Sequence, residues 1–199
     1  FIQFHISPNV KEREYLTEDE LKAVMTHEFA DSKLAYIRDI FIFASFTVLS
    51  FVDIQELTND NIVEVNGEKW ILSKRHKTKV AFQVKLLDIP LQIVERYRPM
   101  QKDNRIFPDL NYWSICKPLK RMIRECGITK SISFHCSRHG FATLALSKGM
   151  PIESVSRVLG HTNIVTTQLY AKITTQKLDN DLTMFGDKLS KTFNGITMS

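Results

Sequence analysis

Residues 40–52 form a run of thirteen amino acids without a charged side chain, IFIFASFTVLSFV. As a helix this run would be about 20 Å long, which is too short for the hydrocarbon core of a membrane, about 30 Å thick. A segment this apolar is instead expected to be buried inside a folded domain. We therefore predict a long helical region over residues 32–57 at the centre of the core, either as one helix or as two, with Thr47–Ser50 as the possible interruption.

The segments on either side of this region carry clear local signals. Thr17 and Glu20 match the capping box that begins a helix. Asn66-Gly67 separates two alternating apolar runs, which is a strong signal for a β-hairpin, and residues 80–87 predict a third strand. Helical patterns occur in the segments 89–98, 112–126, 133–146, 151–159, 163–170 and 174–190. The expected fold is mainly α with a small antiparallel β-sheet, in the α+β class.

Length, charge and cysteine content restrict the function more weakly. The chain has 199 residues and a formal net charge of +5. This length suits one compact domain, and the positive charge favours an acidic partner such as nucleic acid. The three cysteines, Cys116, Cys126 and Cys136, are an odd number without paired spacing. We therefore expect no disulfide framework and a reducing compartment, the cytoplasm.

Groups that bind or react with phosphate are concentrated in the second half of the chain. Three potential cations stand at the start of a helix: His135, Arg138 and His139. The helix dipole disfavours positive charge at this end, so we expect these side chains to hold an anion. His161 follows Leu159-Gly160, and Tyr170 comes nine residues later. A phenol that attacks phosphate needs donors that neutralise charge on the nonbridging oxygens. The planar guanidinium of arginine suits this task because it binds two oxygens at once.

The order and spacing of these residues resemble a known family. The segments HCSRHGFAT, residues 135–143, and VLGHTNIVTTQLY, residues 158–170, resemble the C-terminal signature of the tyrosine recombinases, the phage-type integrases. In addition, Lys77-Thr78 matches the position of the family's catalytic lysine on a strand of its hairpin. The resemblance covers about residues 15–185, and it implies the tyrosine recombinase catalytic-domain fold.

The resemblance implies a role for each matching residue. Tyr170 attacks the scissile phosphate and forms a 3′-phosphotyrosyl bond, while Arg138, His135 and His161 stabilise the transition state. Lys77 protonates the departing 5′-oxygen. The implied reaction is site-specific cutting and rejoining of DNA. Because the covalent bond conserves the energy of the phosphodiester, the reaction is expected to need no ATP, no metal and no other cofactor.

The chain departs from the family pattern at one catalytic position. The family stretch Thr-Gly-Leu-Arg-x-x-Glu corresponds to residues 47–53, where Ser50 stands in place of the arginine and Asp53 at the acidic position. In this respect the chain resembles a branch of mobile-element integrases that lack this arginine. Our candidate for a surrogate is Arg75, because on a strand it would share one face with Lys77. Asp53 and Ser50 are expected to support the site, although a buried helix serine is the simpler interpretation of Ser50.

The resemblance also implies partners and missing parts. We expect double-stranded DNA as the substrate and a homo-oligomer, a tetramer on recombination sites, without a membrane. The residues expected to bind DNA are Lys74, Lys79 and His139, the last as a structural residue or a backbone contact. The chain begins with Phe rather than Met. We expect residues 1–14 to be a linker from an absent upstream DNA-clamping domain, residues 15–190 the catalytic domain and residues 191–199 a C-terminal tail.

Two other interpretations use the same residues. Zinc is one, because His135, Cys136, His139 and His161 are ligand types and histidines four residues apart on a helix can share a metal. Arg138 among them would repel the ion. The other is a helix-turn-helix in residues 152–170, which leaves a non-catalytic DNA-binding regulator derived from an integrase as the alternative function.

Overall fold

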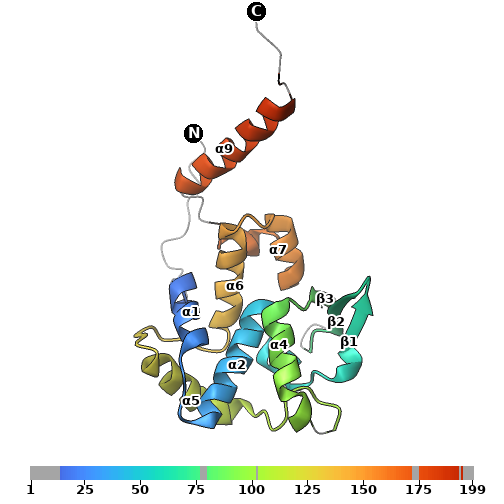
Figure 1. Ribbon diagram of the computed structural model, residues 1–199, viewed down its shortest axis with the longest axis vertical. Helices are drawn as coiled ribbons and strands as arrows, with labels where there is room; N and C mark the ends of the chain where they lie inside the picture. Colours follow the sequence, from blue (N-terminus) through green and yellow to red (C-terminus); the bar gives the residue numbers. More distant parts are fainter. Residues whose placement is uncertain (1–13, 77–79, 102, 172–174, 193, 195–199) are drawn as a thin grey trace, which may run out of the picture.

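A computed structural model describes residues 14–76, 80–101, 103–171, 175–192 and 194 (Figure 1). Most of these residues are helical, and the strands form one small antiparallel sheet, as the sequence predicts. The helices are α1 (Glu18–Thr26), α2 (Ser32–Thr47), α3 (Phe51–Gln55), α4 (Asp88–Tyr97), α5 (Tyr112–Glu125), α6 (Cys136–Ser147), α7 (Ile152–Leu159), α8 (Val165–Gln168) and α9 (Thr175–Thr192), with short 3-10 turns at Asn59–Asn61 and Arg98–Met100.

The apolar run forms the central helix α2, against which α1, α4, α5 and α6 pack. Its side chains Phe41 and Phe43 are at most 1% exposed, so the expected burial is confirmed. The helical region is divided in two: α2 ends at Thr47, and α3 begins at Phe51. The division occurs because Val48 adopts a left-handed backbone conformation with a φ of 61°. This conformation ends the α2 hydrogen-bond ladder and leaves the Val48 carbonyl available to side chains.

The predicted hairpin is present. Strand β1 (Ile62–Val65) pairs with β2 (Glu68–Lys74), and β2 pairs with β3 (Ala81–Lys85) in the order β1-β2-β3. Asn66 and Gly67 both have positive φ, 53° and 77°, as a two-residue hairpin turn of this type requires. The third strand is shorter than predicted because the chain leaves it to begin α4. The sheet matters for function because the end of β2 leads directly to Arg75.

A second, smaller apolar cluster joins the end of α2 to α6 and α7, which lie side by side in Figure 1. Val48 is fully buried in this cluster, and Tyr170 packs against it as a partly buried side chain. The buried members are Val48, Ala142, Leu146, Val155 and Leu159. This packing brings α6 and Tyr170, which lie about 90 and about 120 residues further along the chain, to the end of α2.

Helix α9 (red in Figure 1) extends away from the other helices. Its apolar side chains Leu182, Met184 and Phe185 are 58–60% exposed. Among the residues that the structure describes, no helix is both long enough and apolar enough to cross a membrane. The N-terminal residues 1–13, nearly all of the expected linker, lie outside the described residues, as do Lys77 and Lys79.

Candidate active site

The candidate site is organised around the carbonyl oxygen of Val48 at the end of α2. This oxygen accepts hydrogen bonds from Nη1 of Arg75 at 3.1 Å and from Nη1 of Arg138 at 3.2 Å. The two arginines come from opposite sides of the site, one after strand β2 and the other from α6. The carbonyl that the end of α2 leaves outside the helical hydrogen-bond ladder thus brings together two guanidinium groups that are far apart in sequence.

Arg138 projects from the first turn of α6, as its place in the motif predicts. Besides the Val48 carbonyl, its Nη2 donates to the carbonyl oxygen of Leu159, the last residue of α7. Burial, together with the smaller effect of the nearby positive charge of Arg75, lowers the pKa of Arg138 to about 10. Arg138 remains charged at neutral pH, and a bound anion would offset the cost of burying this charge beside Arg75.

Arg75 lies directly after β2, where its N–H donates to the carbonyl of Val80 at 2.8 Å. Its guanidinium donates to Oδ2 of Asp53 at 3.1 Å and to the carbonyl of Val158 at 3.2 Å, and it lies 4.3 Å from the ring centroid of Phe82. The residue is only 9% exposed. Arg75 is therefore held on several sides beside Arg138, and not in the solvated basic face that its lysine neighbours would suggest.

Asp53 connects Arg75 to the position where the family arginine is missing. Ser50 is the N-cap of α3, and its hydroxyl donates to Oδ2 of Asp53 at 2.8 Å in a capping box. Burial alone would raise the pKa of Asp53, but hydrogen bonds from the His76 N–H, Ser50 and Arg75 outweigh it and hold the pKa below its usual range. Ser50 itself is exposed. The interpretation of Ser50 as a buried helix serine is therefore wrong, because it caps α3 at the surface.

His161 lies in the turn between α7 and α8. Its Nδ1 is 2.8 Å from Oγ1 of Thr167, a fully buried side chain of α8. Partial burial lowers the pKa of His161, and the charge of Arg138 lowers it further. The imidazole is consequently oriented by Thr167 and electrostatically coupled to Arg138. The hydrogen bond to Thr167 was not expected from the sequence.

Tyr170 follows α8, and its hydroxyl lies 2.6 Å from Nδ1 of His139. His139 is 6% exposed and its ring packs against Tyr170, which suits the structural role, one of the two that the sequence predicts for this residue. His135, the residue before α6, is exposed, and its ring lies 4.7 Å from that of His139. The motif residues His135, Arg138, His161 and Tyr170 thus gather at one end of the domain.

The charges of the arginine pair favour an anion. Arg75 and Arg138 carry two positive charges, and Asp53, the ion-pair partner of Arg75, supplies one negative charge. Tyr170 is close enough to Arg138 to affect the pKa of that guanidinium. Such an arrangement of donors beside a phenol is what nucleophilic attack on a phosphate requires.

The ligand types of the zinc interpretation do not form a metal site. Within the described part of the chain, no three His, Cys, Asp or Glu side chains are placed to hold one ion. The three cysteines are free thiols.

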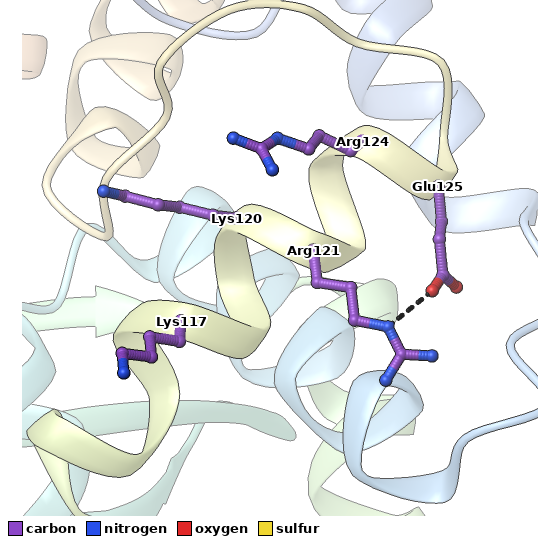
Figure 2. Close-up of a pocket in the computed structure, with 5 residues that line it drawn as sticks. All are labelled: Lys117, Lys120, Arg121, Arg124 and Glu125. Atoms are coloured by element: carbon purple, nitrogen blue, oxygen red, sulfur yellow. Dashed lines mark hydrogen bonds and ion pairs between the residues drawn. The ribbon is translucent and has the colours of Figure 1, made fainter.

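A second positively charged surface lies on α5, as Figure 2 shows. The side chains that line this hollow are Lys117, Lys120, Arg121, Arg124 and Glu125. Arg121 pairs with Glu125 at 2.8 Å and with Asp31, the N-cap of α2, at 3.2 Å. Because Asp31 and Val48 are at opposite ends of α2, about 24 Å apart for a helix of this length, this surface is separate from the arginine pair.

Comparison with known proteins places these residues in a family context. The profile described as "Phage integrase family" matches residues 14–177. Among curated proteins, the tyrosine recombinase XerA of Pyrococcus horikoshii is 32% identical over 177 residues, which are 82% of this chain and 58% of XerA. The chain therefore spans little more than half the length of this relative.

Two solved structures have a similar fold. One is the XerH site-specific recombinase bound to its difH substrate in a pre-cleavage complex, with a TM-score of 0.66 at 23% identity over 86% of this chain and 54% of XerH. The other is the Tn1549 transposon integrase in complex with circular intermediate DNA, with a TM-score of 0.68 at 16% identity over 89% of this chain and 67% of that chain.

Proposed function

Since the chain belongs to the phage integrase family, we propose that it is the catalytic part of a site-specific DNA recombinase. It cuts and rejoins DNA strands through a covalent 3′-phosphotyrosyl intermediate. The observation that carries this proposal is the convergence of Arg75 and Arg138 on one carbonyl, with His161 and Tyr170 beside Arg138. These residues come from separate elements, and a purely structural role would not require them to meet.

In the proposed reaction, the Tyr170 oxygen attacks the scissile phosphorus while the bond to the 5′-oxygen breaks. Arg138, Arg75 and His161 bind the nonbridging oxygens, on which negative charge grows. Lys77 gives a proton to the 5′-oxygen as it departs. His135, exposed at the start of α6, supplies a further hydrogen bond to the phosphate. No step uses a metal or ATP, because the donors are protein groups and the phosphotyrosyl bond keeps the energy for rejoining.

Arg75 takes the place of the arginine that the family carries at position 50. Its contacts with Asp53 support this assignment, since Asp53 stands at the family's acidic position and is the N3 residue of the α3 capping box. The guanidinium thus reaches the site from the end of a strand rather than from the helix. On this basis we place the chain with the mobile-element integrases that lack the helical arginine.

Several parts of the proposal concern partners. Double-stranded DNA would be bound by an upstream clamping domain joined through residues 1–14, with Lys74 and Lys79 contacting the backbone near the hairpin. The basic surface of α5 adds positive potential at a distance from the chemistry. The assembly on a recombination site is a tetramer, and the exposed apolar side chains of α9 pack on a second copy of the chain. We place the reaction in the cytoplasm, in agreement with the free cysteines.

The regulator alternative has less support. A protein that only binds DNA would need neither the arginine pair nor a phenol held beside it. In addition, α8 is only four residues long, which is short for a recognition helix.

The test is covalent capture of DNA. Nicked duplexes from a randomised pool, which lose a short fragment after cutting and so trap the intermediate, are incubated with the protein and recovered under denaturing conditions. We expect a covalent complex with the parental protein and none with Tyr170→Phe, because Phe removes only the hydroxyl. Noncovalent DNA binding should be equal for the two proteins. Covalent attachment by the Phe variant would show that Tyr170 is not the nucleophile.

A further inference from the structure

The Tyr170 hydroxyl and Nδ1 of His139 are separated by 2.6 Å, the length of a strong hydrogen bond between an oxygen and a nitrogen. The planes of the two rings are tilted by 43°, with centroids 5.3 Å apart. The nucleophile proposed above is therefore in direct contact with an imidazole, whose ring nitrogens can donate or accept a proton. The roles carried over from the motif include none for His139.

The backbone holds His139 in this place. It lies in the first turn of α6, next to Arg138, so the two side chains diverge by about 100° around the helix. The Arg138 guanidinium points to the ends of α2 and α7, where the phosphate is expected to bind. The His139 imidazole is buried against Tyr170. One helical turn thereby supplies a donor for the phosphate and a partner for the phenol.

The other histidines of the site are engaged differently. Nδ1 of His161 is bonded to Thr167, and the low pKa of His161 is a consequence of burial and of Arg138. His135 is exposed at the start of α6 and contacts His139 ring to ring. Their placement suits donors to a phosphate that approaches from solvent, whereas His139 is buried against the nucleophile.

We propose that His139 accepts the proton of Tyr170 during strand cleavage, an inference that rests on the proposed function. The O–H bond of Tyr170 breaks and its proton passes to Nδ1 of His139, while the phenolic oxygen bonds to phosphorus and the P–O5′ bond breaks. The 5′-oxygen takes its proton from the separate acid, Lys77. In rejoining, the 5′-hydroxyl attacks the phosphotyrosine, its proton returns to Lys77, and His139 gives its proton back to Tyr170. Protons and bonds therefore balance over the full cycle.

Two substitutions distinguish acceptance of the proton by His139 from simple positioning of the Tyr170 phenol. Asparagine places an amide near the position of Nδ1, so His139→Asn can keep a hydrogen bond to the phenol but cannot take its proton. Thr143→Val is a matched control, because the Thr143 hydroxyl donates to the His139 carbonyl at 3.2 Å without touching the imidazole. If the Asn variant does not fold, judged by thermal unfolding, His139→Gln replaces it.

The experiment measures the single-turnover rate of covalent complex formation on nicked duplexes enriched with the parental protein. We expect His139→Asn to lower the rate by about a hundredfold, the usual scale for loss of a general base. Thr143→Val should remain within about threefold of the parental rate. The measurement is repeated with 3,5-difluorotyrosine at position 170, a phenol that loses its proton more easily. The penalty of His139→Asn should then shrink to less than about tenfold, since the phenol depends less on a base.

Two results would overturn the proposal: a parental rate in His139→Asn, or a penalty that is the same with tyrosine and with difluorotyrosine. The second result would assign His139 a packing role only. Failure of the parental protein to form any covalent complex would be a different outcome, because it would remove the proposed function and this inference with it.

Discussion

The two sides of the candidate site differ in how they relate to the family pattern. The side formed by α6, α7 and α8 keeps the spacing of His135, Arg138, His161 and Tyr170. The side formed by the end of α2, α3 and the end of β2 has Ser50 where the family pattern predicts an arginine, and it contains Arg75. The difference teaches that a guanidinium can reach this side of the site from the end of a strand. The Val48 carbonyl and the Asp53 carboxylate hold a guanidinium even though it comes from another element.

The two sides also differ in charge. Arg75 donates to a carboxylate as well as to carbonyls, so its charge is compensated before any ligand binds. Arg138 donates to the carbonyls of Val48 and Leu159, and its pKa is lowered by burial and by Arg75. Arg138 therefore gains more from a bound phosphate, whereas Arg75 is preorganised. Substitutions on the two sides should accordingly have different consequences.

The largest expected effect that tests this comparison is that of Arg75→Ala. We expect the cleavage rate at saturating protein to fall by about a hundredfold or more, the scale for loss of one transition-state donor. Arg75→Lys should recover only part of the rate, because an ammonium lacks the planar fork. The measurement is single-turnover cleavage of a nicked duplex, which separates chemistry from binding.

Lys74→Ala is the matched control for this prediction, since Lys74 is an exposed neighbour in β2. At saturating protein, its cleavage rate should stay close to the parental value, because loss of a contact with the DNA backbone weakens binding rather than the chemical step. In Ser50→Arg, a guanidinium is restored at the family position beside Asp53, and the dependence on Arg75 should decrease. Cleavage by Arg75→Ala at the parental rate would break the comparison, because some other cation would then have to complete the site.

Asp53→Asn should have an intermediate effect, with a cleavage rate lower by about tenfold, because the substitution leaves Arg75 without its charged partner. Removal of the buried charge should also cost about 1–3 kcal/mol of unfolding free energy at neutral pH. The pKa of Asp53 is lowered in the folded state, so its contribution is complete above the unfolded value near 4 and is lost as the pH falls through the folded value. The difference in stability between parental protein and variant should therefore vanish at low pH. A difference that stays unchanged from neutral pH to a pH well below the folded value, where Asp53 is protonated in both the folded and the unfolded state, would contradict the ion pair.

A smaller effect concerns binding alone. DNA affinity should fall steeply with salt, by about tenfold or more between about 50 and 200 mM, because phosphate contacts release counterions. Lys120→Ala on the α5 surface should reduce the slope of log affinity against log salt by about 1, without changing single-turnover cleavage at saturating protein. Lys148→Ala is a control, since Lys148 is an exposed lysine paired with Glu18. An affinity that does not change with salt would contradict the electrostatic interpretation.

The smallest expected effect is that of a chelator. EDTA should change the cleavage rate by less than about twofold, because the donors on both sides of the site are protein groups and no proposed step uses a metal. The comparison is made on the parental protein with and without added magnesium. A strict requirement for a divalent cation would contradict the assignment of the arginine pair.

Local signals in the sequence predict the elements well. The Asn66-Gly67 turn, the Thr17 capping box and the apolar run each follow from short-range preferences, and all three are present in the structure. The side of the site formed by α6, α7 and α8 could also be predicted from the sequence, because its motif residues lie in one segment, residues 135–170. The contacts of Arg75 with Asp53, 22 residues away, and with Val158, 83 residues away, depend on tertiary packing.

The remaining features have no sequence signature of their own. Val48 acts through its backbone carbonyl, which any residue has, and only its left-handed conformation makes that carbonyl available to the arginines. His139 resembles a surface cation in the motif, since the sequence does not show which face of α6 is covered by Tyr170. Ser50 lies in the segment where the sequence allows either one helix or two, and only the break at Val48 makes it an N-cap.

The most direct test of the central claim is the identity of the residue that becomes linked to DNA. The covalent complex formed on a nicked duplex is digested with trypsin and nuclease, and the modified peptide is sequenced by mass spectrometry. We predict a nucleotide joined through its 3′-phosphate to Tyr170, together with a free 5′-hydroxyl on the released strand. An adduct on any other residue, or a linkage through a 5′-phosphate, would contradict the proposed reaction.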